Sequence, residues 1–250
     1  MNSITLPRAA VHRGALILVN ASHPLADGFS PALAPLSGDG HILLDRTAAA
    51  LLRACIQACG GESEIVAVSG WRSHGEQQRI WDDSLAGHGE RFTRRYVALP
   101  GCSEHQTGLA IDLGRAARRI DFIRPAFPNH GACGRFRRMA AGYGFIERYQ
   151  HSKEAVTGIA AEPWHFRYVG APHARLIHDH GLCLEEYVPF LRDGGARLCP
   201  LGDGRCAQVF YVPCQGETTE IELPGEATIS GDNDGGFIVT LWSASRSRIA

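Results

Sequence analysis

His105 and Asp112 lie seven residues apart in the segment SEHQTGLAID. The apolar residues around Asp112 predict a buried strand, where a carboxylate is costly unless a cation compensates its charge. Period-2 alternation puts Asp112 on the same strand face as Ala110 and Gly108, whose small size leaves room for a ligand or a metal ion. By itself, the pair fits a hydrogen bond in the core as well as it fits a metal site.

Glu162 and His165 form a second pair of chemistry-bearing side chains, in the segment EPWH. A glutamate three residues before a histidine can act as a general base beside a metal ligand, as the HExxH helix of other zinc peptidases does in a different geometry. His105, Asp112 and His165 together offer two imidazoles and one carboxylate. This set leaves one coordination position open, as catalytic zinc sites do. Glu162 is then free to take a proton from the attacking water.

Arg72 lies in the turn SGWRS, directly after the apolar segment 64–68. Its planar guanidinium could bind a substrate carboxylate or a developing oxyanion. An arginine at such a turn, considered alone, more often forms a surface ion pair. The neighbouring Trp71, and Trp164 of the segment EPWH, fit the wall of a pocket as well as they fit a core.

Periodicity and breaker residues predict the elements that must position these side chains. Apolar residues recur at helical spacing over residues 45–59, and Gly60-Gly61 ends that pattern. Ser73 and Glu76 have the spacing of a capping box, which predicts a helix to about residue 85. The other predicted elements are strands at 15–19, 64–68, 108–113, 145–148 and 164–169, and helices at 135–141 and 172–180.

The C-terminal part of the chain changes in character. Alternating β-branched and aromatic residues at 207–212, 220–223 and 237–242 are separated by Gly, Pro, Asn and Asp, which predicts antiparallel strands. We therefore expect an α+β fold with one domain at residues 1–193 and a small β-rich extension at residues 194–250 packed on it.

Composition restricts the class of protein. The 250 residues include 25 Lys and Arg against 26 Asp and Glu, and this balance disfavours a nucleic-acid binder. The apolar run at residues 15–19 is shorter than the roughly 7–15 residues of a signal-peptide core. No run approaches the ~20 apolar residues of a membrane span. We expect a cytoplasmic protein whose eight cysteines are mostly reduced and structural.

Three motifs, SGWRS, SEHQTGLAID and EPWHFRYVG, resemble in order and spacing those of VanY- and VanXY-type peptidases. These are zinc D-alanyl-D-alanine carboxypeptidases and dipeptidases with the hedgehog-like metallopeptidase fold. The segments LVNASHPL and TISGDNDGGFIVT are also similar to the VanXY type, so the resemblance covers nearly the whole chain. It implies an antiparallel sheet with flanking helices.

The resemblance implies a role for each of the residues above. His105, Asp112 and His165 would bind one zinc ion per chain. Glu162 would be the catalytic acid/base, and Arg72 would contact the substrate carboxylate or the transition state.

The resemblance also implies the reaction, which is hydrolysis of the terminal D-Ala-D-Ala bond of cell-wall precursors or of the free dipeptide. Gln77 and Ser103 match positions that line the substrate site, and Trp164 is expected there as a pocket wall. The partner would be a small peptide. In the cytoplasm this means D-Ala-D-Ala or soluble nucleotide-linked pentapeptides, whose removal would serve glycopeptide resistance.

Two alternatives stay open. One is a zinc peptidoglycan endopeptidase that cuts internal bonds of the L-Ala-D-Glu type with the same ligand set. The other is a non-catalytic zinc-binding module, as some hedgehog-like relatives are. The presence of Glu162 and Arg72 beside the metal ligands argues against the second alternative.

Overall fold

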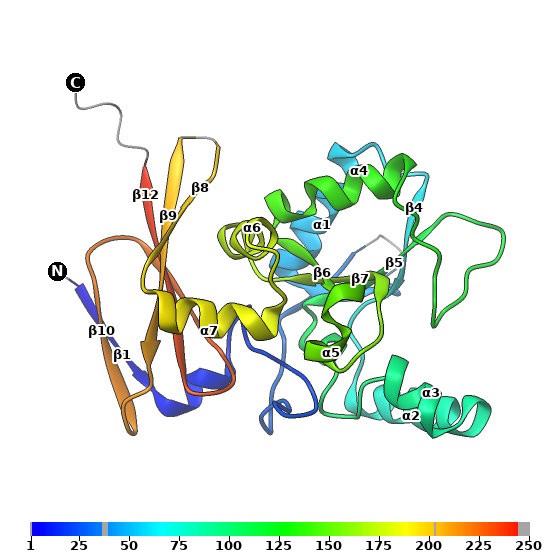
Figure 1. Cartoon of the computed structure of the whole chain (residues 1–250), viewed down its shortest axis with the longest axis horizontal. Helices are drawn as coiled ribbons and strands as arrows, with labels where there is room; N and C mark the ends of the chain where they lie inside the picture. The colour runs from blue at the N-terminus through cyan, green and yellow to red at the C-terminus, as the bar shows by residue number, and fades with distance from the viewer. Residues whose placement is uncertain (1, 37–39, 203, 245–250) are drawn as a thin grey trace. The chain divides into compact units, whose positions relative to one another are not determined.

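The computed structural model describes residues 2–36, 40–202 and 204–244. Contacts group the chain into two compact units, one of Val19–Gly170 and the other of Met1–Leu18 with Ala171–Ala250 (Figure 1). This grouping differs from the predicted domain ranges 1–193 and 194–250, which stay a prediction.

The unit Val19–Gly170 contains, over its described residues, a four-stranded antiparallel sheet with the order β4-β5-β7-β6. Its strands are β4 (Ile65–Ser69), β5 (Ala110–Arg115), β6 (Phe145–Tyr149) and β7 (Glu162–Tyr168). Two short strands, β2 (Leu33–Pro35) and β3 (Leu43–Asp45), pair separately. The four strands predicted between residues 64 and 169 are thus confirmed, with small shifts at their ends.

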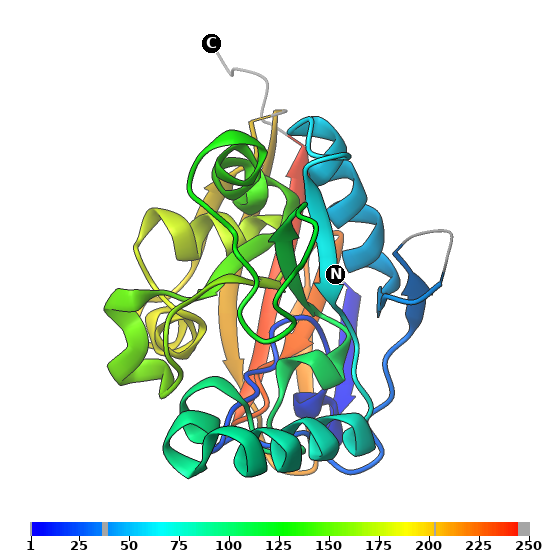
Figure 2. The ribbon, with the colours of Figure 1, turned by 90° about the vertical axis from the view of Figure 1, so that its right-hand side faces the viewer.

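Helices α1 (Arg46–Ala58) and α4 (Gly131–Ala140) cover one face of this sheet, whereas α2 (His74–His88), α3 (Glu90–Tyr96) and α5 (Glu154–Thr157) lie on the other side (Figures 1 and 2). The apolar core lies on the face of α1 and α4. There, the rings of Phe127, Phe136 and Phe166 meet edge to face at centroid distances of 5.0 to 5.9 Å. The opposite face of the sheet is thereby left to polar side chains.

Side-chain caps set where the helices of this unit begin. Asp45 accepts hydrogen bonds from the backbone N–H groups of Thr47 and Ala48 at the start of α1. Ser73 and Glu76 form the predicted capping box at the start of α2. Because α2 begins directly after the SGWR turn, this cap fixes the chain direction next to Arg72.

The other unit contains two antiparallel sheets in its described residues. Strand β1 (Asn2–Pro7) pairs with β10 (Thr218–Leu223). The second sheet has the order β11-β12-β9-β8, with β8 (Arg197–Pro200), β9 (Arg205–Pro213), β11 (Ala227–Gly231) and β12 (Gly236–Ala244). The helices of this unit are α6 (Ala171–Asp179), α7 (Leu184–Gly194) and the 3-10 helix η1 (Arg8–His12).

The C-terminal predictions hold in β9, β10 and β12, and the helix predicted at 172–180 is α6. Helix α7 was not predicted. The predicted strand at residues 15–19 is wrong, because these described residues form no strand. Their backbone instead bonds to β11 and to the turn after it: the N–H of Leu16 donates to Ser230 Oγ, and that of Leu18 donates to the carbonyl of Asp232.

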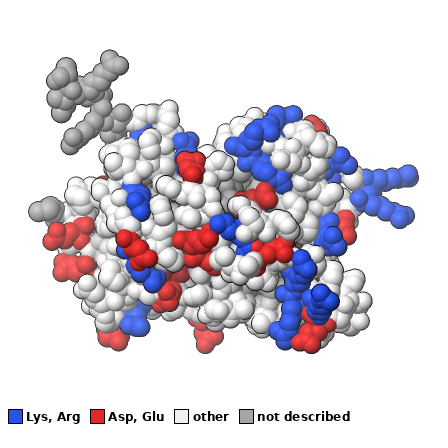
Figure 3. Space-filling view, viewed as in Figure 1, with Lys and Arg blue, Asp and Glu red and all other residues white. Residues whose placement is uncertain are grey.

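Three general features bear on the class of protein. Within the described part of the chain, no helix combines the length and the apolar composition needed to cross a membrane. All eight cysteines lie in the described ranges and are free thiols, five of them buried. On the face shown in Figure 3, basic and acidic side chains are interspersed.

Candidate metal centre and active site

The central strands place two of the predicted metal ligands side by side. Asp112 on β5 pairs directly with His165 on β7 and, on its other side, with Ser69 on β4. His105 reaches the same place from the 3-10 helix η2 (Glu104–Thr107), which precedes β5. Gly108 ends η2 at a φ of +72°, a left-handed conformation that glycine adopts without strain, and lets the chain turn into the strand.

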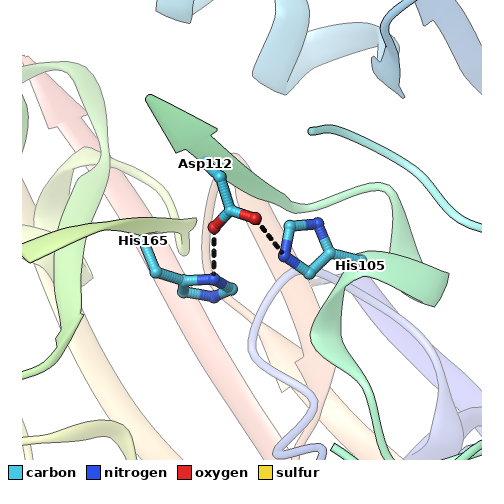
Figure 4. Close-up of side chains that lie close together, drawn as sticks. All are labelled: His105, Asp112 and His165. Carbon is cyan, nitrogen blue, oxygen red and sulfur yellow. Dashed lines mark hydrogen bonds and ion pairs between the residues drawn. The ribbon is translucent and has the colours of Figure 1, made fainter. Parts of the chain in front are cut away.

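The side chains of His105, Asp112 and His165 converge, and their ligand atoms lie within 4.8 Å of one another (Figure 4). Asp112 Oδ1 is 3.0 Å from His165 Nδ1, and Oδ2 is 3.2 Å from His105 Nε2. All three side chains are buried. Two imidazole nitrogens and one carboxylate oxygen, with room for a further ligand, are a donor set that suits catalytic zinc.

The remaining nitrogen of each imidazole also has a partner. His105 Nδ1 lies 2.7 Å from the carbonyl oxygen of Gly70, so this nitrogen donates and Nε2 keeps its lone pair toward Asp112. His165 Nε2 lies 3.4 Å from Glu104 Oε2. Histidine ligands of protein metal sites are oriented in this way by a carbonyl or a carboxylate. The residues therefore fit a zinc ion in their hydrogen bonding as well as in their type.

Glu104 was not among the predicted site residues. Its Oε1 accepts a hydrogen bond from Arg148 Nε at 2.8 Å and lies 2.9 Å from Arg167 Nη1, and all three side chains are fully buried. Arg148 and Arg167 each fall within a segment predicted as a strand of the sheet. Because a buried charge needs a partner, these two arginines were the signal that could have pointed to an acidic residue nearby.

Glu162 lies beside the proposed ligands, with its Oε2 3.8 Å from His165 Nδ1. Strict strand alternation would put these two residues on opposite faces of β7. The pairing of β7 with β6 shifts register next to Pro163, however, and this irregularity lets both side chains reach one pocket. Burial raises the pKa of the Glu162 carboxyl to about 8, close to the neutral range in which a general acid/base works best.

Arg72 is held by three side chains rather than by solvent. Its Nε donates to Ser69 Oγ at 2.9 Å, Nη1 to Gln77 Oε1 at 3.3 Å, and Nη2 to Asp112 Oδ2 at 3.0 Å. Gln77 is fixed in turn, because its Nε2 donates to the carbonyl of Ala98 at 2.8 Å. The interpretation of Arg72 as a surface ion pair therefore does not apply. Its guanidinium is a fixed charge at the edge of the site.

The charges of the site shift the pKa values of its members in opposite directions. Burial opposes ionisation of Asp112, but His105 and His165 more than offset this effect and hold the pKa of the carboxyl well below its usual range. Burial lowers the pKa of His165, whereas hydrogen bonds with Asp112 and Glu104 raise it, with a net value of about 9. Both shifts reflect the attraction between the carboxylates and the imidazoles of the site.

All eight predicted site residues line one pocket. They are Arg72, Gln77, Ser103, His105, Asp112, Glu162, Trp164 and His165. Trp164 also packs on the apolar core, so the two interpretations given for it both hold. Further walls, which were not predicted, come from Tyr96 on α3, Phe122 in the β5–α4 loop and Tyr149 on β6.

Known proteins with the same features identify the family. A family model described as VanY, D-alanyl-D-alanine carboxypeptidase, matches residues 41–171, slightly more than half of the chain, and this range contains every residue of the predicted site. The chain belongs to the VanY family of D-alanyl-D-alanine carboxypeptidases. Among curated relatives, the bifunctional D-Ala-D-Ala dipeptidase and D-Ala-D-Ala carboxypeptidase VanXYC of Enterococcus gallinarum is 43% identical over 180 residues. The match covers 70% of this VanY-family chain and 94% of VanXYC.

Solved structures of D,D-peptidases extend the match. The vancomycin resistance D,D-dipeptidase VanXYg, solved with a D-Ala-D-Ala phosphinate analogue, is 44% identical to this chain, with a TM-score of 0.93. The match covers 97% of this chain and 99% of that one. A mutant of the D,D-pentapeptidase VanY from the VanB-type resistance cassette, solved with Zn(II), is 30% identical. It has a TM-score of 0.58 over 70% of this chain and 98% of that one. The predicted fold and the predicted class of metallopeptidase are thereby confirmed.

Proposed function

We propose that this VanY-family chain is a zinc-dependent D,D-carboxypeptidase and D,D-dipeptidase with one zinc ion per chain. Its substrates would be cell-wall precursors that end in D-Ala-D-Ala, and the free dipeptide. The observation that carries the proposal is the convergence of His105, Asp112 and His165 with Glu162 beside them and outside the ligand set. A purely structural zinc site would be closed by a fourth protein ligand and would need no buried carboxyl at its edge.

Glu162 is the proposed acid/base. When bound, zinc would polarise the scissile carbonyl and lower the pKa of water. Glu162 would take the proton of the attacking water and later deliver it to the amine of the departing D-alanine. In the metal-free site, burial raises the pKa of this carboxyl well above its ordinary range, which shows that the pocket lets Glu162 hold a proton as well as accept one.

Arg72 is the proposed partner of negative charge on the substrate. Because Ser69, Gln77 and Asp112 fix its guanidinium, the charge is in place before the substrate binds and needs no reorganisation during the reaction. It could stabilise the developing oxyanion or bind the C-terminal carboxylate of the peptide. Gln77, which orients Arg72, and Ser103 and Trp164, which line the same pocket, are the proposed substrate-site residues.

We place the proposed reaction in the cytoplasm, as expected from the sequence. The eight free thiols are compatible with a reducing compartment. There the enzyme would meet D-Ala-D-Ala and soluble nucleotide-linked pentapeptides. Removing both would favour wall precursors with other termini, a role in glycopeptide resistance like that named for VanXYg.

The test is D-alanine release from D-Ala-D-Ala, from a pentapeptide ending in D-Ala-D-Ala and from the same pentapeptide with an amidated C-terminus, each with and without a chelator. We expect release from the first two, loss of activity on chelation and recovery with zinc. Cleavage of the amidated peptide at an internal bond would instead favour the endopeptidase alternative. Activity that survives complete removal of metal would exclude the zinc mechanism.

A further inference from the structure

Glu104 divides its two carboxylate oxygens between different partners. Oε1 faces two guanidinium groups, Arg148 Nε at 2.8 Å and Arg167 Nη1 at 2.9 Å. Oε2 faces His165 Nε2 at 3.4 Å. The side chains of Glu104, Arg148 and Arg167 are all 0% exposed, so the carboxylate cannot turn toward water. Its position is therefore set by charges from β6 and β7.

His165 consequently has a carboxylate at each ring nitrogen. Nδ1 lies 3.0 Å from Asp112 Oδ1, on the side of the proposed zinc ligands, and Nε2 faces Glu104. A neutral imidazole carries its one proton on either nitrogen. A proton on Nδ1 would occupy the lone pair that a metal needs, whereas a proton on Nε2 leaves that lone pair free. The carboxylate that accepts the hydrogen bond therefore decides whether Nδ1 can bind a metal ion.

We propose that Glu104 is a positioning residue that holds His165 in the Nε2-protonated form and so prepares Nδ1 to bind zinc. The identity of the ion rests on the function proposed above. Arg148 and Arg167 keep Oε1 in place and leave Oε2 to accept from Nε2–H. Removing such an outer hydrogen-bond partner from a metal-binding histidine typically weakens metal binding about 10–100-fold.

His105 also has one ring nitrogen bonded to an acceptor outside the ligand set, but this acceptor is a backbone carbonyl. His105 donates from Nδ1 to the carbonyl oxygen of Gly70 at 2.7 Å, which leaves Nε2 toward Asp112. A backbone carbonyl cannot be replaced by substitution, but Glu104 can. Of the two groups that orient the imidazoles, Glu104 is therefore the one that a substitution can test.

A matched pair of variants separates this role from a merely structural one. Glu104→Gln removes the charge, and its amide can turn an NH₂ group toward His165 Nε2. Glu147→Gln is the control, because Glu147 lies on β6 of the same sheet, pairs with Arg137 of α4 and does not line the pocket. Zinc affinity is measured on metal-free protein by competition with a chromophoric chelator. We expect Glu104→Gln to bind zinc about 10–100-fold more weakly, and Glu147→Gln to bind it as the wild type does.

A second measurement needs no variant. The ¹⁵N and ¹H NMR signals of His165 in zinc-loaded wild-type protein should show a proton on Nε2 and none on Nδ1. A proton on Nδ1, or unchanged zinc affinity in folded Glu104→Gln, would overturn the role of Glu104. Equal losses of affinity in Glu104→Gln and Glu147→Gln would also overturn it, since both would then act through the fold. A wild-type protein that binds no zinc would overturn the proposed function itself and this role with it.

Discussion

Asp112 and His165 are 53 residues apart in the chain, yet they occupy directly paired positions on the antiparallel strands β5 and β7. The ladder of backbone hydrogen bonds, rather than a loop, therefore sets the distance between two of the proposed zinc ligands. Sites built on regular elements hold their geometry more closely than sites built on loops. His105, from the 3-10 helix before β5, completes the set.

Asp112→Asn should weaken zinc binding by at least about 100-fold, because it replaces a proposed ligand of the ion. Loss of an outer hydrogen-bond partner of a ligand typically costs about 10–100-fold in affinity, and loss of the ligand itself should cost more. The charge of Arg72, 3.0 Å from Asp112 Oδ2, would then face the cation without a carboxylate between them. Asp121→Asn, which changes an exposed carboxylate in the β5–α4 loop, is the charge-matched control. Chelator competition on both variants measures the effect. A zinc affinity of Asp112→Asn equal to that of the control would contradict the assignment.

Glu162→Gln should lower kcat for D-alanine release by about 10²–10⁴-fold while the protein still binds zinc. The amide keeps the size and much of the polarity of the carboxyl but cannot carry a proton between water and the leaving amine. Metal analysis and D-Ala-D-Ala hydrolysis on the same sample separate the two effects. Wild-type turnover in a zinc-loaded Glu162→Gln protein would exclude Glu162 as the acid/base.

Arg72→Lys should reduce kcat/KM by about 10²-fold or more, because an ammonium group cannot reproduce the planar fork that bonds to Ser69, Gln77 and Asp112 at once. Arg79→Lys on the exposed side of α2 controls for the general effect of the exchange. Steady-state kinetics on D-Ala-D-Ala distinguish the two. Equal kinetics for both variants would mean that Arg72 acts only through its charge.

The sequence predicted the sheet strands, and the residues that converge at the proposed metal site, because each left a local signal. His105, Asp112, Glu162 and His165 stand in compact motifs, and the strands that carry three of them are rich in apolar and aromatic residues. Glu104 left only a weak signal of this kind. Its role depends on Arg148 and Arg167, which approach it only once the sheet has formed.

The errors in the predicted fold have a similar cause. Residues 15–19 have the composition of a strand, but the groups that their backbone N–H donors reach, such as Ser230 Oγ, are more than 200 residues away and form no strand ladder with them. Helix α7 was missed because Pro189 lies inside it, and a proline normally argues against a helix interior. In both segments, contacts with residues distant in the sequence decide the secondary structure against the local preference of the residues.

His173 should make the protein less stable in acid. Burial lowers its pKa to about 3, from an ordinary value near 6.5, and its ring bonds to Tyr187 and Thr240. The unfolded chain therefore binds a proton that the folded chain does not, so stability that is present above about pH 6.5 is lost progressively as the pH falls toward 3.

The variant His173→Gln removes this titration and should reduce the fall in the free energy of unfolding between pH 7.5 and pH 5. His178→Gln, on the exposed side of the same helix, should leave that fall unchanged. Urea unfolding at the two pH values measures both. An identical pH dependence of unfolding in wild type and His173→Gln would show that His173 does not contribute.

The most direct test of the central claim is a zinc titration of metal-free protein, followed by D-alanine release from D-Ala-D-Ala. If His105, Asp112 and His165 bind one catalytic ion, activity should be absent at the start, rise in proportion to added zinc and level off at one ion per chain. Full activity before any zinc is added, or activity that does not respond to zinc, would contradict the account.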